Sequence, residues 1–144
     1  MGPPRDAPLD DEQIRNIVFN ETQSLSGDDL PAARVQIAQA IMNADTRWGP
    51  LRTKHAGTAP SYIEHAPDPR QQGILSDVAA AVIMARTLHM IGIDTVNGAT
   101  NYNLRTMESS RPPSWGKTFT LEKSWGPFQD SVGSPKHIHI WQNR

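Results

Sequence analysis

Apolar residues recur with a helical period in three stretches of the first two thirds of the chain. The stretch 10–25 opens with acidic residues, which the helix dipole favours in a first turn. The stretch 30–46 follows Asp29, a capping residue type, and carries Pro31 in its first turn, where proline is tolerated. The stretch 74–91 is strongly apolar and is predicted to be the central, most buried helix. The apolar positions behind these predictions are Ile14, Ile17, Val18 and Leu25, then Val35, Ile37 or Ala38, Ile41 and Met42, then Leu75, Val78, Ala79, Val82, Ile83 and Leu88.

After Gly92 the period changes to two, because β-branched and aromatic residues alternate with polar ones. Turn residues separate the alternating segments, at Ser109 to Ser114, at Gly126-Pro127 and at 133–135. Short strands joined in this way favour antiparallel pairing. The sequence therefore predicts an α+β fold, with three main helices followed by a small antiparallel sheet of about three strands. The predicted strands are 99–104, 117–121 and 136–141.

About two dozen residues between the second and third predicted helices show no sustained period. This segment, 47–70, is predicted as a long loop, and such loops in compact domains tend to be functional. The proline-rich residues 1–9 are predicted as a flexible N-terminal arm. Since 144 residues suit one domain, 10–144 is predicted to be a single domain.

Composition narrows the classes of partner and of chemistry. The formal net charge is −1, so the basic surface expected of a nucleic-acid-binding protein is missing. Cysteine is absent, which excludes disulfides, thiolate zinc sites and cysteine nucleophiles. No apolar run reaches the roughly 18 residues of a membrane span, and no signal peptide is visible at the N-terminus. We expect neither nucleic acid nor a membrane span, and the compartment stays open.

Glu21 is the first candidate for catalysis, because its spacing from Ile17, Val18 and Leu25 places it on the apolar face of the first predicted helix. Burial of a carboxyl group disfavours its charged form and suits it to donate a proton near neutral pH. A glutamate at the edge of an apolar stripe can also simply reach solvent or a backbone group. Spacing alone leaves both interpretations open.

His137 and His139 stand two residues apart on a predicted strand, so their side chains share one face. They could share a metal ion, with His55, His65, His89 or a carboxylate as further ligands, or they could line a polar cleft. No H-E-x-x-H or comparable spacing is present, and we expect no metal and no cofactor. A Ser-His-Asp set can be assembled as well, but no G-x-S-x-G motif accompanies it.

The loop and the sheet half hold most of the tryptophans and tyrosines, whose faces could stack on sugar rings or pack in the core. The segment 97–103 is dense in amide, hydroxyl and phenol groups, which suit a neutral polyol ligand. Its Asn-Gly pair also has the usual role of such a pair in a turn.

Taken together, these segments resemble the cell wall hydrolase family of the spore-cortex-lytic (SleB) type. The segments stand in family order and span about Ile14 to Trp141. After the glutamate, the chain reads Thr22-Gln-Ser-Leu where the family commonly continues with Ala-Arg-Gly and an acid. The segments that carry the resemblance are Val18-Phe-Asn-Glu-Thr22, Ile37-Ala-Gln-Ala-Ile-Met-Asn43, Asp94-Thr-Val-Asn-Gly-Ala-Thr-Asn-Tyr-Asn103, Ser114-Trp115 and Gly133-Ser-Pro-Lys-His-Ile-His139.

The resemblance implies a lysozyme-like fold and cleavage of the β-1,4 bond between muramic acid and glucosamine units of peptidoglycan. By motif position, Glu21 would be the catalytic acid. No second carboxylate matches the motif, so attack by the 6-hydroxyl of the same sugar, as in a lytic transglycosylase, is the first choice. Asp94, Glu64 or Asp130 could instead activate water for hydrolysis. The residues expected to contact substrate are Asn43, Thr100, Tyr102, Asn103, Trp115, His137 and His139.

Two other classes stay open from the sequence. One is a non-catalytic glycan- or partner-binding module on the same scaffold, in which Glu21 is structural. The other is a small metallohydrolase or peptidase built around His137 and His139, which a chelator would inactivate. A wall-lytic enzyme would act in the periplasm or outside the cell, in phage lysis, as an antibacterial effector or as a mature domain. It would meet peptidoglycan strands and a cognate export or inhibitor protein.

Overall fold

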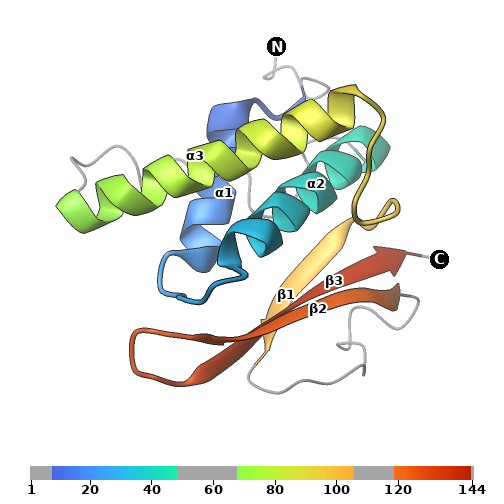
Figure 1. The fold of residues 1–144 in the computed structure, drawn as a ribbon. Coiled ribbons are helices and arrows are strands. Elements are labelled where there is room, and N and C mark those ends of the chain that lie inside the picture. The colour runs from blue at the N-terminus through green and yellow to red at the C-terminus, as the bar shows by residue number, and fades with distance from the viewer. Residues whose placement is uncertain (1–7, 49–67, 106–118, 144) are drawn as a thin grey trace, which may run out of the picture.

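Three helices lie on one face of a small antiparallel sheet (Figure 1). This computed structural model describes residues 8–48, 68–105 and 119–143. The arrangement confirms the predicted α+β fold, with the helices preceding the sheet in the chain. The elements are α1 (Asp11–Thr22), α2 (Leu30–Trp48), α3 (Pro69–Met90), β1 (Asn101–Arg105), β2 (Phe119–Gln129) and β3 (Pro135–Asn143).

The ends of α1 and α3 are fixed by capping boxes. At the start of α1, the Asp10 side chain accepts from the Gln13 backbone N–H at 2.8 Å, and the Gln13 side chain accepts from the Asp10 N–H at 3.0 Å. The same exchange between Asp68 and Gln71, with Pro69 in the first turn, begins α3. The third helix therefore starts five residues before the predicted position.

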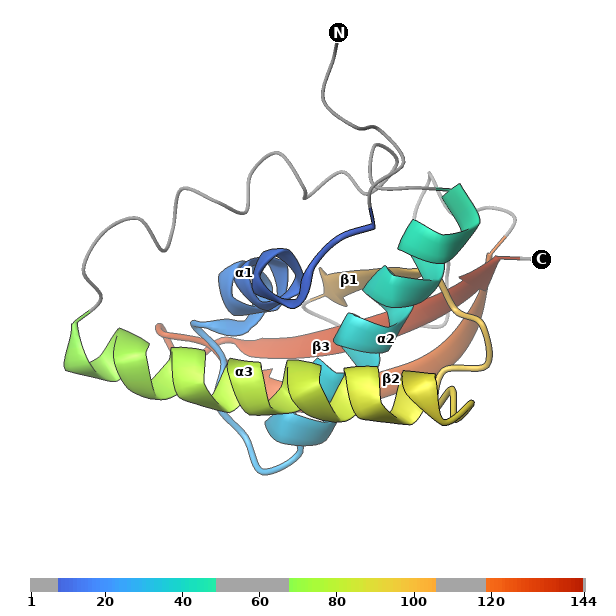
Figure 2. The same cartoon turned by 90° about the horizontal axis from the view of Figure 1, so that it is seen from above.

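The prediction that the third helix is the most buried one is wrong. α3 buries only Val78, Ala81, Val82 and Ala85, whereas Ile83 is 62 % exposed. The central helix is α2, which contacts α1, α3, β1 and β3. α3 runs along one side of the molecule, with α1 and α2 on its inner side (Figure 2). Its length and composition are those of a helix that could cross a membrane, a test that core helices of soluble proteins also pass.

The sheet has the strand order β1-β3-β2, with β3 antiparallel to both neighbours. The turn before β3 lies at 131–134, so it overlaps the predicted turn 133–135, but Pro135 already belongs to β3. The predicted turn at Gly126-Pro127 is wrong, because β2 runs on to Gln129 through a register shift between Trp125 and Phe128. Gly126 has φ +119°, and a Cβ there would lie 2.8 Å from the Lys136 carbonyl oxygen, so the irregular strand requires glycine.

Alternation along the strands divides the sheet into a helix-facing and an outer face. On β1, Tyr102 and Leu104 pack against the apolar core. On β3, Ile138 and Ile140 belong to that core, so the intervening His139 side chain points to the outer face. Residues 1–7 of the predicted arm 1–9, most of the predicted loop 47–70 and the predicted turn 109–114 lie outside the described residues. The prediction of a flexible arm is wrong for Leu9, because its side chain is buried in the core and its N–H donates to the Asp45 carboxylate at 2.8 Å.

Candidate functional site

Glu21 stands in the last turn of α1 and is half-buried. Its carboxylate acts electrostatically on Tyr102 of β1: burial of the phenol raises the Tyr102 pKa well above its usual value of 10, and the Glu21 charge raises it further. Tyr102 lies on the helix-facing side of the sheet. The Glu21 carboxyl group therefore lies near the Tyr102 phenol, which stays protonated at neutral pH.

The turn that carries Glu21 is anchored to α2 through Thr22 and Arg34. The Arg34 Nε donates to the Thr22 hydroxyl at 2.9 Å, and one terminal nitrogen donates to the Thr22 carbonyl at 3.4 Å. The Thr22 hydroxyl donates in turn to the Val18 carbonyl at 2.7 Å. Burial lowers the Arg34 pKa, partly offset by the charge of Asp77. The arginine remains cationic, and its position at the carboxyl end of α1 suits the helix dipole.

Arg34 is a positioning residue that the sequence motifs do not include. Arg34 is only 4 % exposed, three and four residues before the buried Ile37 and Ala38. A cation in phase with an apolar helical stripe is the signal that could have identified it, because a charge at such a position requires a partner.

Asn43 holds the loop that leads into β1. Its amide nitrogen donates to the Asp94 carboxylate at 3.0 Å and to the Ala99 carbonyl at 3.0 Å. The Asp94 carboxylate also accepts from the Val96 and Gly98 backbone N–H groups, at 2.9 and 2.7 Å. These contacts give both side chains a positioning role for the strand that carries Tyr102.

Thr100 is buried directly before β1. Its backbone N–H donates to the Trp141 carbonyl at 3.2 Å, and its hydroxyl donates to the Asn101 side chain at 2.8 Å. Thr100 thus fixes the start of the β1–β3 pairing.

Asn103, His137 and His139 lie on the outer face, opposite Tyr102. Asn103 pairs directly with His139 in the β1–β3 register, and its side-chain oxygen accepts from the Trp141 indole at 2.7 Å. The rings of His137 and His139 are 6.4 Å apart, and those of His139 and Trp141 are 5.7 Å apart. His139 is 0 % exposed. The structure thus divides the predicted substrate-binding set between two faces of the sheet.

The carboxylates considered for activating water have different surroundings. Asp94 serves the loop before β1, and Asp130 accepts from the Val132 and Ser134 N–H groups at 3.0 and 2.8 Å in the β2–β3 turn. Glu64 and Trp115 lie outside the described residues. Within the described ranges, no group of three or more histidine, aspartate or glutamate side chains could hold a metal ion.

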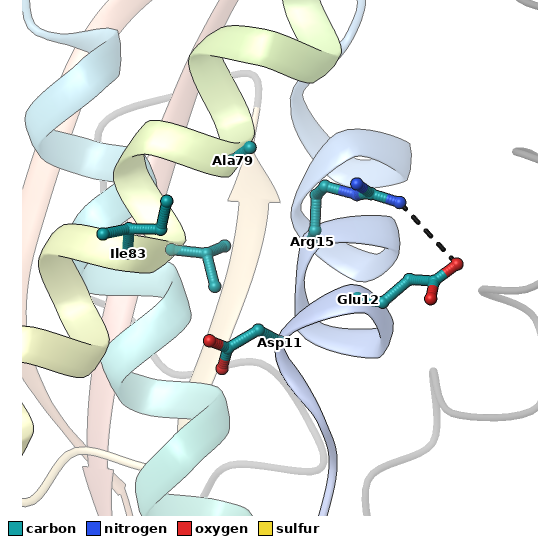
Figure 3. A pocket seen from close by; sticks show the side chains of 6 residues that line it. Asp11, Glu12, Arg15, Ala79 and Ile83 are labelled. Atoms are coloured by element: carbon teal, nitrogen blue, oxygen red, sulfur yellow. Dashed lines mark ion pairs between the residues drawn. The ribbon is translucent and has the colours of Figure 1, made fainter.

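A hollow of about 270 Å³ lies between α1 and α3 (Figure 3). Its α1 residues stand in the first turns of that helix, whereas Glu21 stands in the last turn. Acidic and basic side chains of the first turns of α1 form one wall, and apolar side chains of α3 form the other. The Asp11 carboxylate in this wall pairs with Arg86 of α3 at 2.9 Å. The lining residues are Asp11, Glu12, Arg15, Ala79, Val82 and Ile83.

In comparisons with known proteins, no family model matches the chain, and no curated protein or solved structure matches it either. The resemblance to the spore-cortex-lytic type therefore rests on the sequence motifs alone.

Proposed function

We propose that this protein cleaves the glycan strands of peptidoglycan at the β-1,4 bond between muramic acid and glucosamine, with Glu21 as the general acid and base. The observation that carries the proposal is that Glu21, in the last turn of α1, lies close enough to Tyr102 on the helix-facing side of β1 for its charge to act on the phenol. These residues come from two of the five segments that resemble the wall hydrolase family, and the two lie far apart in sequence.

In this mechanism Glu21 in its protonated form donates to the glycosidic oxygen as the bond breaks, and positive charge develops on the muramic sugar. The Tyr102 phenol, neutral because of its raised pKa, is suited to donate a hydrogen bond to a sugar hydroxyl or an N-acetyl group. Arg34 and Asn43 act indirectly, since they fix the helix turn and the strand that carry these two groups.

The proposed product is a 1,6-anhydro sugar. After bond cleavage, Glu21 as a carboxylate takes the proton of the 6-hydroxyl of the same sugar, and that oxygen closes on the anomeric carbon. Hydrolysis would need a carboxylate to activate water. Of the candidates within the described residues, Asp94 and Asp130 are already acceptors for backbone N–H groups, and Glu64 lies outside those residues. Among the described carboxylates, this difference favours a lytic transglycosylase over a muramidase.

The test is digestion of purified peptidoglycan, with the soluble products resolved by mass. We expect anhydro-muropeptides from the parent protein and a rate lower by about 10²–10⁴-fold from Glu21→Gln. The matched control is Glu12→Gln on the same helix, because the Glu12 side chain is 70 % exposed and should not affect the rate. Products with a free reducing end, lost in Glu21→Gln, would indicate a muramidase instead.

Three outcomes would contradict the proposal. Glycan cleavage that persists in Glu21→Gln would remove Glu21 from the chemistry, and loss of cleavage on adding EDTA would favour the metallohydrolase hypothesis. Binding of intact glycan strands with no cleavage by any form would favour the non-catalytic module.

A further inference from the structure

Two asparagine side chains of α1 hold buried oxygen atoms without a hydrogen-bond donor. The Oδ1 atoms of Asn16 and Asn20 are out of contact with solvent, and within the described part of the chain neither accepts a hydrogen bond. Asn16 is 5 % exposed as a whole residue, and Asn20 is half-buried. A buried acceptor without a donor destabilises a fold, and nearly all buried polar groups of native proteins have a partner. The two amides are therefore suited to accept hydrogen bonds from a ligand.

Asn16 and Asn20, which we call the asparagine pair, stand one turn apart on the same side of α1, with about 6 Å between their Cβ atoms. At about 100° per residue, this side is turned away from Ile14 and Val18, which belong to the apolar core. It is also turned away from Arg15, which lines the hollow towards α3. The pair therefore lies on a side of α1 that packs neither in the core nor against α3.

The asparagine pair leads along α1 to the proposed general acid. Asn20 directly precedes Glu21, and Asn16 lies about one turn, roughly 5 Å, further along the helix. A glycan strand whose scissile bond lies at Glu21 therefore has a neighbouring sugar within reach of the pair. A side chain at this place can distinguish which sugar stands next to the bond.

We propose that Asn16 and Asn20 bind the glucosamine unit next to the scissile bond, by accepting from its acetamido N–H and from the adjacent 3-hydroxyl. This inference rests on the proposed function. The two donors stand on neighbouring ring carbons, so two acceptors one helical turn apart can receive both. Muramic acid lacks the second donor, because the oxygen on its carbon 3 carries the lactyl ether. The asparagine pair thereby selects the bond that follows muramic acid.

A binding role and a structural role predict opposite effects on stability. In the free protein the two acceptors are unpaired, so an apolar side chain of similar shape removes a destabilising group. The same change removes an acceptor that the bound sugar uses. Asn20→Leu should therefore weaken glycan binding without lowering the melting temperature of the free protein, as is common where function and stability conflict.

The first test is a calorimetric titration of Glu21→Gln, which lacks the proposed acid, with tetra-N-acetylchitotetraose. This soluble N-acetylglucosamine tetramer carries both donors on every sugar. Adding Asn20→Leu should raise the dissociation constant about tenfold. Adding Asn20→Asp, which keeps an acceptor oxygen, should not raise it. The matched control is Glu12→Leu on the same helix, because the Glu12 side chain is 70 % exposed and faces the hollow.

The second test is thermal unfolding of the same variants without glycan. The melting temperature of Asn20→Leu should be no lower than that of the parent protein. Asn16→Ala adds no volume inside the fold and provides an independent variant, which should also weaken binding of the tetramer about tenfold.

Three results would overturn the role of the asparagine pair. They are equal affinities with and without Asn20→Leu, a fall in the melting temperature of Asn20→Leu, and no binding of the tetramer by Glu21→Gln at millimolar concentration. Cleavage that depends on Glu21 but is unchanged by Asn20→Leu would also remove the pair, while the proposed function would stand. Absence of cleavage by the parent protein contradicts the proposed function alone, because the titration measures binding in a variant that lacks the acid.

Discussion

Replacing Thr22 by valine should destabilise the protein far more than the loss of one surface hydroxyl would. Thr22 is 0 % exposed, and its hydroxyl accepts from the Arg34 Nε at 2.9 Å. Valine keeps the shape of the side chain but leaves a donor of a buried guanidinium without an acceptor. Hydrogen bonds to charged groups contribute about 1.5–3 kcal/mol, so we expect a loss of about 2 kcal/mol in the free energy of unfolding. For a chain of this length, the melting temperature should fall by about 6 °C.

The control is Thr22→Ser, which keeps the hydroxyl and removes one methyl group. Its cost should be about 1 kcal/mol, from lost apolar burial and the small cavity that remains. Urea unfolding followed by tryptophan fluorescence measures both variants.

A double-mutant cycle separates the hydrogen bond from the rest of the site. Once Arg34→Met has removed the guanidinium, Thr22→Val orphans no donor and should cost about 0.5 kcal/mol or less. The coupling energy between the two positions should therefore be about 1.5 kcal/mol. Additive effects, or equal costs for the serine and valine variants, would refute the assignment of Arg34 as the anchor of the α1 end.

Three further predictions concern β1, β2 and the loop that leads into β1. The raised pKa of Tyr102 means that its protonated phenol stabilises the fold below about pH 10, and this stabilisation is lost as the pH rises past 10. Denaturant titrations between pH 9 and 11 should therefore show a falling free energy of unfolding, with a shallower fall in Tyr102→Phe. Gly126→Ala should lower the free energy of unfolding by about 2–4 kcal/mol, because the residue has φ +119° and the new Cβ would lie 2.8 Å from a carbonyl oxygen of β3. The control is Gly73→Ala, which should cost nothing, since its Cβ would have no neighbour within 4 Å. Thermal unfolding measures both variants. Asn43→Ala should lower the free energy of unfolding by about 1–3 kcal/mol, because it removes two hydrogen bonds to the loop before β1. It should also slow glycan cleavage, since that loop positions β1. Unfolding and cleavage are measured on one preparation.

The helices could be predicted from the sequence because each repeats its apolar pattern over several turns. Their ends were less certain. The cap of α1, Asp10, is one turn before the first apolar residue of its helix, Ile14, whereas Asp68 is nearly two turns before Ile74. The box that Asp68 forms with Gln71 extends α3 beyond its apolar pattern.

The buried side of α3 could not be predicted, for a different reason. Its apolar residues surround the helix, so its own sequence does not distinguish Val78, which is buried, from Ile83, which is exposed. Only packing against α1 and α2 selects the inner side. Similarly, the Gly126-Pro127 pair is typical of a turn, and only pairing with β3 carries β2 past it.

Part of the candidate site follows from local spacing and part does not. Helical spacing alone put Glu21 on the inner side of α1, and alternation alone put His137 and His139 on one face of a strand. Whether those histidines share a face with Tyr102 depends on the register between β1 and β3, which no single segment encodes. The observed register sets Asn103 opposite His139 and Tyr102 opposite Ile140, so the phenol and the imidazoles point to opposite faces.

This division constrains how the outer face can contribute to the proposed reaction. A sugar that contacts Glu21 and Tyr102 lies on the helix-facing side of β1, and one layer of backbone separates it from the imidazole of His139. Because His139 is 0 % exposed and its ring packs against Trp141, it contributes through the order of β3 rather than through contact with that sugar. Glycan specificity in this mechanism therefore depends on the helix-facing ends of α1 and β1, and the histidine pair that the motif placed in the site supports the strand behind it.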